Sequence, residues 1–310
     1  MQEPIRIGVV GVGHIGQHHA RICAELPQTE LIGVFDVEEQ RCREVAERCR
    51  TEAFRSLEEL AARCQALTIA TPTGTHFPVA NACLQSGCHV LVEKPIADQI
   101  EQARALVLLA REKGLLLQVG HVERFNPAFR AMESLLRAPR FIEAHRLCPY
   151  PGRNVEIGVV FDLMIHDLEI VLHLVRTPLV SIDAVGVSVL SPTEDIANAR
   201  IRFADGAVAN LTCSRISPEK MRKIRIFQDD AYLSLNYGDQ CGEIYRKKDG
   251  RIEREPIPVE KDEPLRLQIA SFVDCVRSHV VPVVDGGKGV AALDLAMQIS
   301  DRIGEGMAAP

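Results

Sequence analysis

A charged tripeptide, Glu93-Lys94-Pro95, follows the apolar run 89–92, which reads as a buried strand. A lysine at the end of a strand is a candidate for acid–base or electrostatic chemistry. The peptide bond before a proline adopts the cis form at modest cost, and a tight turn there would direct Lys94 towards whatever binds beyond the strand. Lys94 is therefore the first candidate for a catalytic residue, and Glu93 is expected to share its site.

A glycine-rich loop, Gly11-Val-Gly13-His14-Ile15-Gly16, lies between a predicted strand and a predicted helix. In this context the first glycine permits a tight turn, the second lets the backbone approach a pyrophosphate, and the third lets the helix pack on the strand. We expect His14 and Ile15 to contact the same ligand. A glycine-rich turn without a ligand is the alternative, but the position of the loop favours dinucleotide binding.

Asp36 ends the second predicted strand, about 20 residues after Gly16, where a carboxylate accepts hydrogen bonds from ribose hydroxyls. The first cationic residue that follows it is Arg41. A 2′-phosphate would therefore meet a carboxylate without a nearby cation. The sequence predicts NAD rather than NADP as the cofactor.

The segment Thr71-Pro72-Thr73-Gly-Thr75-His76 follows the third long strand at its carboxyl end. Its hydroxyl and backbone N–H groups could line the cofactor site, which makes Thr71, Pro72, Thr73 and His76 candidate contacts. Thr75 could equally cap the helix that begins at His76. The sequence leaves both interpretations open.

Asp162 and His166 lie four residues apart in an apolar helical stretch, so their side chains should share one helix face. Asp162 could then fix the orientation and tautomer of His166, which could accept a hydroxyl proton as a general base. A satisfied Asp-His pair in the core is the alternative. Neighbouring Asp, Glu and His residues do not complete a convincing metal ligand set, so no metal is expected.

The elements that position these residues alternate between strand and helix over the first 121 residues. Apolar strand patterns at 5–10, 31–35, 66–70, 89–92 and 115–119 are separated by helical patterns at 14–26, 38–49, 56–59, 76–86 and 98–113. This alternation predicts a parallel, doubly wound α/β domain over residues 1–121.

From residue 122 the pattern changes to consecutive strands. Helices are predicted at 126–136, 159–175, 265–278 and 289–303, and strands at 140–147, 180–190, 196–203, 207–214, 223–228, 232–237 and 243–246. Asp205-Gly206 and Asp249-Gly250 are typical hairpin turns. We expect residues 122–310 to form an α+β domain with an open, largely antiparallel sheet.

Composition narrows the functional classes. The chain has 310 residues and a formal net charge of -6, whereas nucleic-acid binders usually carry a basic excess. It shows no signal-peptide pattern at the N-terminus and no apolar run that could span a bilayer. The expectation is a cytoplasmic protein that binds neither nucleic acid nor membranes.

Together, the loop 11–16, Glu93-Lys94-Pro95 and Asp162-x-x-x-His166 resemble the Gfo/Idh/MocA family of glucose-fructose oxidoreductases and inositol dehydrogenases, over nearly the whole chain. The resemblance implies hydride transfer between a nicotinamide and a sugar or polyol carbon. It also implies that Lys94 and His166 form the catalytic pair with Asp162 as partner, and that the open sheet mediates a homodimer or homotetramer.

The segments 11–20, 119–127 and 158–167 resemble more narrowly the members of this family that oxidise the C3 hydroxyl of UDP-N-acetylglucosamine ahead of an aminotransferase in lipid A diamino-sugar synthesis. A diphosphate needs cations, for which Arg124, Arg146 and Arg153 are candidates, with Asn126 as a further substrate contact. Arginines that only pair with surface carboxylates are the alternative. Dehydrogenation of a free polyol such as myo-inositol, or a non-catalytic NAD-binding regulator, are the competing functions.

Overall fold

The computed structural model describes residues 3–150, 152 and 156–307, which fall into two compact units. The first contains the described residues of Met1–Val122 together with Glu263–Val290, and the second those of Glu123–Asp262 together with Ala291–Pro310. The N-terminal segment of the first unit thus ends at Val122, one residue beyond the predicted boundary at 121. The prediction of a continuous second domain from 122 to 310 needs correction, because residues 263–290 belong to the first unit.

Residues 263–290 belong to the first unit because their helix buries apolar side chains in its core. Helix α8 (Pro264–Ser278) buries Ile269, Phe272 and Val273 in the core that also contains Ile7 of the first strand and Ile22 of the first helix. Burying such side chains removes their apolar surface from water, which stabilises by about 1.5–3 kcal/mol for each. The apolar pattern of α8 was visible in the sequence, but not the core it would join.

The first unit has six parallel strands in the order β3-β2-β1-β4-β5-β6, with helices between them. The strands are β1 (Ile5–Val10), β2 (Thr29–Phe35), β3 (Glu52–Ala53), β4 (Ala66–Ile69), β5 (His89–Glu93) and β6 (Leu117–Gly120). The helices are α1 (Gly16–Glu25), α2 (Glu39–Cys49), α3 (Leu57–Ala61), the 3₁₀ turn η1 (Thr73–Thr75), α4 (His76–Gln85) and α5 (Ile100–Glu112). The predicted doubly wound domain is confirmed, with β3 as an additional short strand.

The parallel arrangement gathers the candidate residues. The carboxyl ends of parallel strands meet at one edge of a sheet, and ligands of doubly wound folds bind there. Gly11 follows β1, Asp36 follows β2, Thr71 follows β4 and Lys94 follows β5. These loops therefore share the ligand-binding edge of the first unit.

The second unit has an eight-stranded sheet in the order β14-β13-β12-β11-β7-β10-β9-β8, antiparallel except for the pair β7–β10. Its strands are β7 (Phe141–Leu147), β8 (Leu179–Val187), β9 (Ile196–Phe203), β10 (Val208–Ser214), β11 (Met221–Gln228), β12 (Ala231–Asn236), β13 (Cys241–Lys248) and β14 (Arg251–Ile257). The predicted, largely antiparallel sheet is confirmed, and β14 is the strand that the sequence analysis missed.

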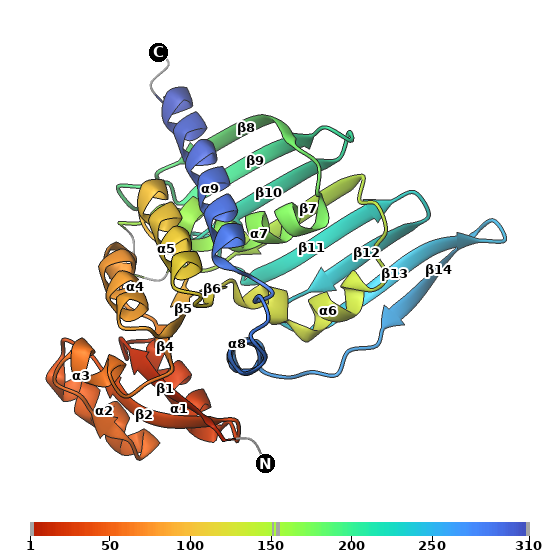
Figure 1. Ribbon diagram of the computed structural model, residues 1–310. Coiled ribbons are helices and arrows are strands. Elements are labelled where there is room, and N and C mark those ends of the chain that lie inside the picture. Colours follow the sequence, from red (N-terminus) through yellow and green to blue (C-terminus); the bar gives the residue numbers. More distant parts are fainter. Residues whose placement is uncertain (1–2, 151, 153–155, 308–310) are drawn as a thin grey trace. The chain divides into compact units, whose positions relative to one another are not determined.

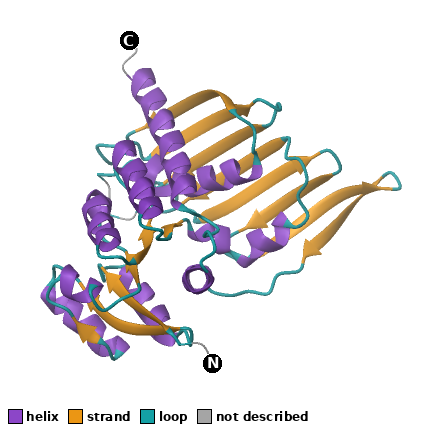
Figure 2. Cartoon of the chain, viewed as in Figure 1, coloured by secondary structure: helices purple, strands orange, loops and turns teal. Residues whose placement is uncertain are grey.

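Helices cover one face of this sheet, as Figures 1 and 2 show. They are the 3₁₀ turn η2 (Val122–Phe125), α6 (Pro127–Glu133), the π-helix η3 (Val160–Met164), α7 (Ile165–Leu174) and α9 (Gly286–Met307). Boundaries between the two units lie within η2 and within α9. Buried residues of α6, α7 and α9 share a core with the strands, including Phe129, Leu168, Leu295 and Leu211. The opposite face of the sheet carries the alternate side chains of each strand.

Candidate active site

The glycine loop has the geometry that a pyrophosphate site requires. Gly11 has a φ of +79°, which an L side chain rarely adopts, and a Cβ at Gly16 would lie 1.8 Å from the carbonyl oxygen of Gly11. A Cβ at Gly13, in contrast, would meet no atom within 4 Å. Packing inside the unit therefore explains Gly11 and Gly16, whereas Gly13 leaves open space for a ligand. His14 and Ile15 beside it are exposed.

Asp36 is held by the loop and by α2. Its Oδ2 accepts a hydrogen bond from the N–H of Val12 (2.8 Å), and its Oδ1 accepts one from the N–H of Glu38 (2.9 Å). The guanidinium of Arg41 donates to both oxygens. Burial alone would raise the pKa of Asp36, but the hydrogen bonds from Arg41, Glu38 and Val12 lower it, so the carboxylate stays ionised.

The contact with Arg41 corrects one premise of the sequence analysis. We expected no cation beside Asp36, yet Arg41 reaches back from the first turn of α2 and leaves its own side chain 45% exposed. The preference for a free ribose hydroxyl over a 2′-phosphate therefore depends on how Asp36 and Arg41 act together rather than on Asp36 alone.

The segment after β4 contributes a hydroxyl group. The Oγ1 of Thr71 is buried and has no hydrogen-bond partner among the described residues, which suits a contact with a bound ligand. Pro72 is exposed and Thr73 half-buried at the start of η1. Thr75 donates its hydroxyl to the carbonyl oxygen of Pro72 and does not cap α4, so the capping alternative is not supported.

The side chain of His76 is turned towards the interior of the first unit. Its ring is 1% exposed, with Nδ1 2.7 Å from the carbonyl oxygen of Pro95 and Nε2 2.9 Å from that of Thr71. Both ring nitrogens are thus occupied inside the unit. The ring therefore cannot offer a free nitrogen to a cofactor, and a contact through the backbone of His76 stays a prediction.

The tripeptide after β5 contains the cis peptide bond that its proline allowed, between Lys94 and Pro95. Glu93 lies against β6, since a Cβ on Gly120 would be 2.5 Å from its Oε1, and the same oxygen is 3.3 Å from Nε2 of buried His19. Burial would raise the pKa of Glu93, but the contact with His19 and the charge of Lys94 lower it. Glu93 is thus occupied by His19, a residue that the sequence analysis did not single out.

Asp162 and His166 lie on a helix that changes winding between them. Asp162 belongs to the π-helix η3, His166 to the first turn of α7, and both side chains are half-buried. The π-helix, which the sequence did not reveal, is a feature often found at functional sites. Lys94 and His166 belong to different units, so their catalytic pairing stays a prediction, as does the role of Asp162.

A loop that is anchored by a buried ion pair supports the start of this helix. The N–H of Val160 donates to the side chain of Glu194 (3.2 Å), beside which Asp195 pairs with Arg215 at 2.7 Å. The carboxylate of Asp195 also accepts hydrogen bonds from the N–H groups of residues 189–191. Asp195 and Arg215 are at most 2% exposed. No local sequence pattern indicated this pair, because its partners are 20 residues apart in two different loops.

The candidate substrate contacts are buried in a second ionic network. Arg124 pairs with Glu169 at 2.8 Å and Arg146 with both Asp167 and Glu123 at 2.9 Å, with these side chains at most 6% exposed. Asn126 donates to Glu123 and to the carbonyl oxygen of Tyr237, and accepts from the N–H of Ala128 as the N-cap of α6.

These contacts change the assignments. The guanidinium groups of Arg124 and Arg146 pair with carboxylates within the unit. These carboxylates are buried, whereas the alternative considered from the sequence was pairing with surface carboxylates. Asn126 likewise has a structural role. This corrects the substrate-binding assignments of Arg124 and Asn126. Arg153, the remaining candidate for the diphosphate, lies outside the described residues.

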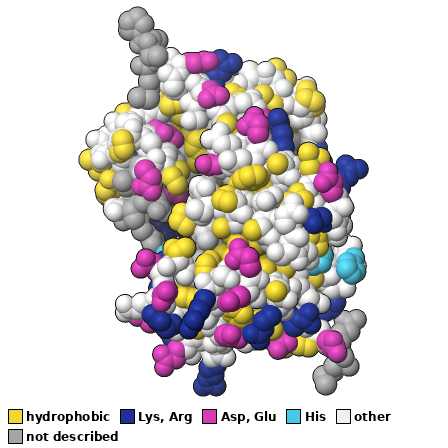
Figure 3. All heavy atoms as spheres, turned by 60° about the vertical axis from the view of Figure 1, so that its left-hand side comes forward, with side chains coloured by type: hydrophobic (Ala, Val, Ile, Leu, Met, Phe, Trp, Pro, Cys, Tyr) yellow, Lys and Arg dark blue, Asp and Glu magenta, His cyan; other side chains and the backbone are white. Residues whose placement is uncertain are grey.

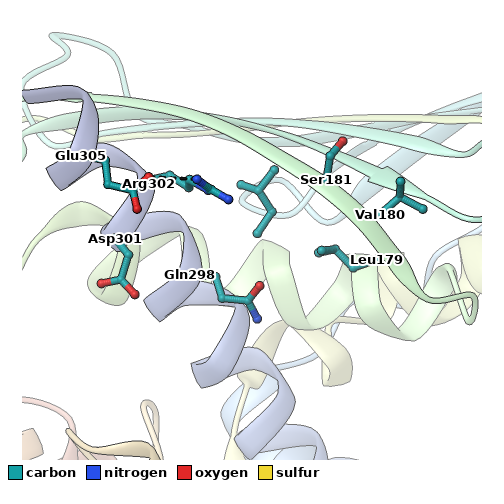
Figure 4. A pocket seen from close by; sticks show the side chains of 8 residues that line it. Leu179, Val180, Ser181, Gln298, Asp301, Arg302 and Glu305 are labelled. Carbon is teal, nitrogen blue, oxygen red and sulfur yellow. Dashed lines mark hydrogen bonds and ion pairs between the residues drawn. The ribbon is translucent and has the colours of Figure 1, made fainter. Parts of the chain in front are cut away.

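A hollow of about 260 Å³ lies elsewhere in the second unit, between β8 and α9. Figure 4 shows Gln298 and Arg302 projecting from α9 towards β8, which contributes Leu179 to the lining. Arg302 pairs with Glu305 at 2.9 Å. None of the candidate catalytic or cofactor residues lines this hollow, so it is separate from the site described above.

The first unit fits a bound dinucleotide. The open space at Gly13, the ionised Asp36 and the buried hydroxyl of Thr71 provide, respectively, room for a pyrophosphate, an acceptor for ribose hydroxyls and a donor. Within residues 3–150, 152 and 156–307, no group of three or more His, Cys, Asp or Glu side chains could hold a metal ion. In the same residues, no helix combines the length and apolarity needed to cross a membrane.

Two family models match the chain. Residues 5–121 match an oxidoreductase family with an NAD-binding Rossmann fold, and residues 138–234 match the GFO/IDH/MocA C-terminal domain. A UDP-N-acetylglucosamine 3-dehydrogenase of Acidithiobacillus ferrooxidans is 38% identical over 302 residues, which cover 95% of this chain and 96% of that protein. A solved structure of that enzyme gives a TM-score of 0.93 and covers 97% of this chain and 98% of its own. A scyllo-inositol 2-dehydrogenase (NAD(+)) of Bacillus subtilis is 24% identical over 99% of this chain and 96% of that protein.

Proposed function

Since the chain belongs to the GFO/IDH/MocA oxidoreductase family, we propose that it is an NAD-dependent dehydrogenase that oxidises the C3 hydroxyl of UDP-N-acetylglucosamine to a 3-keto sugar nucleotide. The observation that carries this proposal is the 38% identity, along almost the full length of both chains, to an enzyme with that activity. Lys94, Asp162 and His166, the residues that the chemistry needs, are all present.

In the proposed mechanism, His166 accepts the proton of the C3 hydroxyl as a general base. Asp162 holds the imidazole in the tautomer that can accept it. The ammonium group of Lys94 stabilises the negative charge that develops on the sugar oxygen. The glycine loop and Asp36 hold the dinucleotide, and NAD supplies the hydride acceptor when bound. Holding the reacting groups at a short, fixed separation lowers the entropic cost of the transfer.

The product suggests the reaction that follows. A 3-keto sugar nucleotide is a substrate for a glutamate-dependent aminotransferase, so we place this enzyme one step ahead of one, in the cytoplasmic synthesis of the diamino sugar of lipid A. We also propose that the chain assembles into a homodimer or homotetramer. On the face seen in Figure 3, acidic and basic side chains are interspersed, which favours small-molecule substrates over a nucleic-acid partner.

The alternative substrate is a free polyol such as an inositol, which the similarity to scyllo-inositol 2-dehydrogenase favours. Such an enzyme would use the same Lys94 and His166, with a different pocket. A non-catalytic NAD-binding regulator is disfavoured, because the proposed catalytic residues are intact.

The test is NADH formation from NAD and UDP-N-acetylglucosamine, coupled to a glutamate-dependent aminotransferase that removes the keto product, with myo-inositol assayed in parallel. We expect activity with the nucleotide sugar only. Lys94→Ala and His166→Ala should each lower kcat by about 10²–10⁴-fold while NAD still binds. Arg153→Ala should raise KM for the nucleotide sugar if Arg153 holds the diphosphate.

Three results would contradict parts of this proposal. Activity with the polyol alone would keep the catalytic residues but reject the nucleotide sugar. NAD binding without turnover of either substrate would support the regulator. Wild-type rates in the Lys94 and His166 variants would remove those residues from the mechanism.

A further inference from the structure

Lys94 projects from a turn whose two flanking residues each contact a buried histidine. Glu93, directly before it, lies 3.3 Å from Nε2 of His19 on α1. Pro95, directly after it, has its carbonyl oxygen 2.7 Å from Nδ1 of His76 on α4. His19 and His76 are both at most 1% exposed. The residue before Lys94 thus contacts one helix of the first unit through its side chain, and the residue after it contacts another through its backbone carbonyl group.

The contacts at Glu93 and Pro95 differ in how much they constrain the turn that carries Lys94. Glu93 is already fixed by the pairing of β5 with β6, where it lies opposite Gly120. Pro95 lies beyond the last ladder residue, and a proline has no N–H with which to anchor itself. The contact of its carbonyl group with His76 therefore bears most directly on the direction in which the Lys94 side chain leaves the sheet.

Both nitrogens of His76 face carbonyl oxygens, which only accept hydrogen bonds. A neutral imidazole carries one N–H, so it donates to one of the two carbonyls at a time. Burial lowers the pKa of His76, although the carbonyl groups of Pro95 and Thr71 and the charge of Glu93 partly oppose this effect. The ring is therefore mainly neutral near pH 7, and the position of its single proton decides which loop it holds.

We propose that His76 is a positioning residue for Lys94: it carries its proton on Nδ1, donates it to the carbonyl oxygen of Pro95, and so fixes the turn from which Lys94 projects. The shorter of its two contacts, 2.7 Å against 2.9 Å, is the one to Pro95. The inference rests on the role proposed above for Lys94. It differs from cofactor binding, because neither ring nitrogen is available to a ligand.

Two substitutions separate the contacts of His76. The side-chain amide of Asn places a donor near the position of Nδ1, and that of Gln places one near Nε2. His76→Asn should keep the hydrogen bond to Pro95 and retain kcat within about threefold of the wild type. His76→Gln should lose this hydrogen bond, and its kcat should fall about tenfold or more. NAD affinity and thermal unfolding, measured in both variants, should stay close to the wild type.

A readout at Lys94 makes the test independent of the substrate. Lysines methylated with ¹³C give resolved NMR signals, and Lys94→Arg identifies the signal of Lys94 by its loss. That signal should be unchanged in His76→Asn and shifted in His76→Gln. This result would stand even if the nucleotide sugar proved to be the wrong substrate, whereas wild-type activity of Lys94→Ala would reject the role of Lys94 itself.

A measurement on the wild-type protein needs no variant to fold. The ¹⁵N chemical shifts of the ring of His76, assigned through its backbone, distinguish the Nδ1–H tautomer from the Nε2–H tautomer. The proposal requires Nδ1–H. It is overturned if the ring is the Nε2–H tautomer, if His76→Gln is at least as active as His76→Asn, or if both variants lose NAD affinity in parallel with activity.

Discussion

Two glycines of the same loop should respond differently to substitution, because only one of them has room for a side chain. A Cβ at Gly16 would collide with the carbonyl oxygen of Gly11, whereas at Gly13 it would meet no protein atom within 4 Å. Gly16→Ala should destabilise the fold by about 1–3 kcal/mol, as overpacking does. Gly13→Ala should leave thermal unfolding unchanged but weaken NAD binding about tenfold, or about 1.4 kcal/mol.

Thermal unfolding and fluorescence titration with NADH measure the two effects separately. Gly87 has a φ of +84°, and a Cβ added to it would meet no atom within 4 Å. Because it lies outside the loop, it provides the control Gly87→Ala, which strains the backbone without loss of cofactor binding. Equal NAD affinity in Gly13→Ala and the wild type would mean that the pyrophosphate does not approach Gly13.

At the level of single residues, the sequence predicted a site residue correctly where the residue type itself determines the local structure or chemistry. The glycine loop, the cis bond at Pro95 and Asp36 were all recognisable in this way. The partners of those residues were not. Arg41 reaches Asp36 only because α2 turns back beside β2, and His76 binds backbone carbonyl groups, which are the same in every sequence.

Among the structural elements, the loop 189–195 depends on the buried pair Asp195–Arg215. Removing one partner of a buried ion pair typically costs about 3–5 kcal/mol, because the other charge stays buried. We therefore expect Arg215→Met to lower the free energy of unfolding by about 3 kcal/mol in urea titrations, and Asp195→Asn/Arg215→Met to lower it less. The exposed pair Glu39–Arg43 gives the control Arg43→Met, with a loss below about 1 kcal/mol. Equal losses in Arg215→Met and the control would contradict this role.

The same pair has a pH signature. Burial would raise the pKa of Asp195, but Arg215 and the N–H groups of 189–191 lower it below its ordinary value of about 3.9. The folded protein then binds fewer protons at this group than the unfolded chain. The contribution of the ionised Asp195 carboxylate to the free energy of unfolding is present above about pH 4, and it is lost as the pH falls through the lowered pKa. Stability of Asp195→Asn should consequently fall less steeply below pH 4 than that of the wild type.

Two elements escaped the sequence analysis for opposite reasons. β14 carries Arg251, Glu253, Arg254 and Glu255 at the edge of its sheet, where charge is common and hydrophobic alternation is weak. The π-helix η3 is hydrophobic like the α-helix that follows it, so periodicity did not distinguish them. A hydrophobic pattern reveals an element through the side chains that it buries. It does not reveal an edge strand that buries few side chains, and it does not distinguish a π-helix from an α-helix.

For the whole molecule, the sequence predicted two fold types and their order but not the path of the chain between them. The segment 263–290 was assigned to the second domain because it follows the antiparallel strands. It belongs to the first unit because Phe272 and Val273 of α8 find their hydrophobic partners there. Which core an amphipathic helix joins depends on the complete set of exposed apolar faces, which local patterns do not supply.

The last prediction concerns the sheet face of the second unit that the helices leave uncovered. Phe227 and Tyr232 stack there with ring centroids 4.7 Å apart, Tyr232 and Tyr245 follow at 4.9 Å, and Phe227 is 36% exposed. Because aromatic side chains are enriched at protein interfaces, we expect this face to join copies of the chain into a dimer or tetramer. Phe227→Glu should shift the mass measured by light scattering towards the monomer, whereas Leu108→Glu, at a site 58% exposed on α5, should not. A monomeric wild type, or an unchanged mass in Phe227→Glu, would show that this face is not the interface.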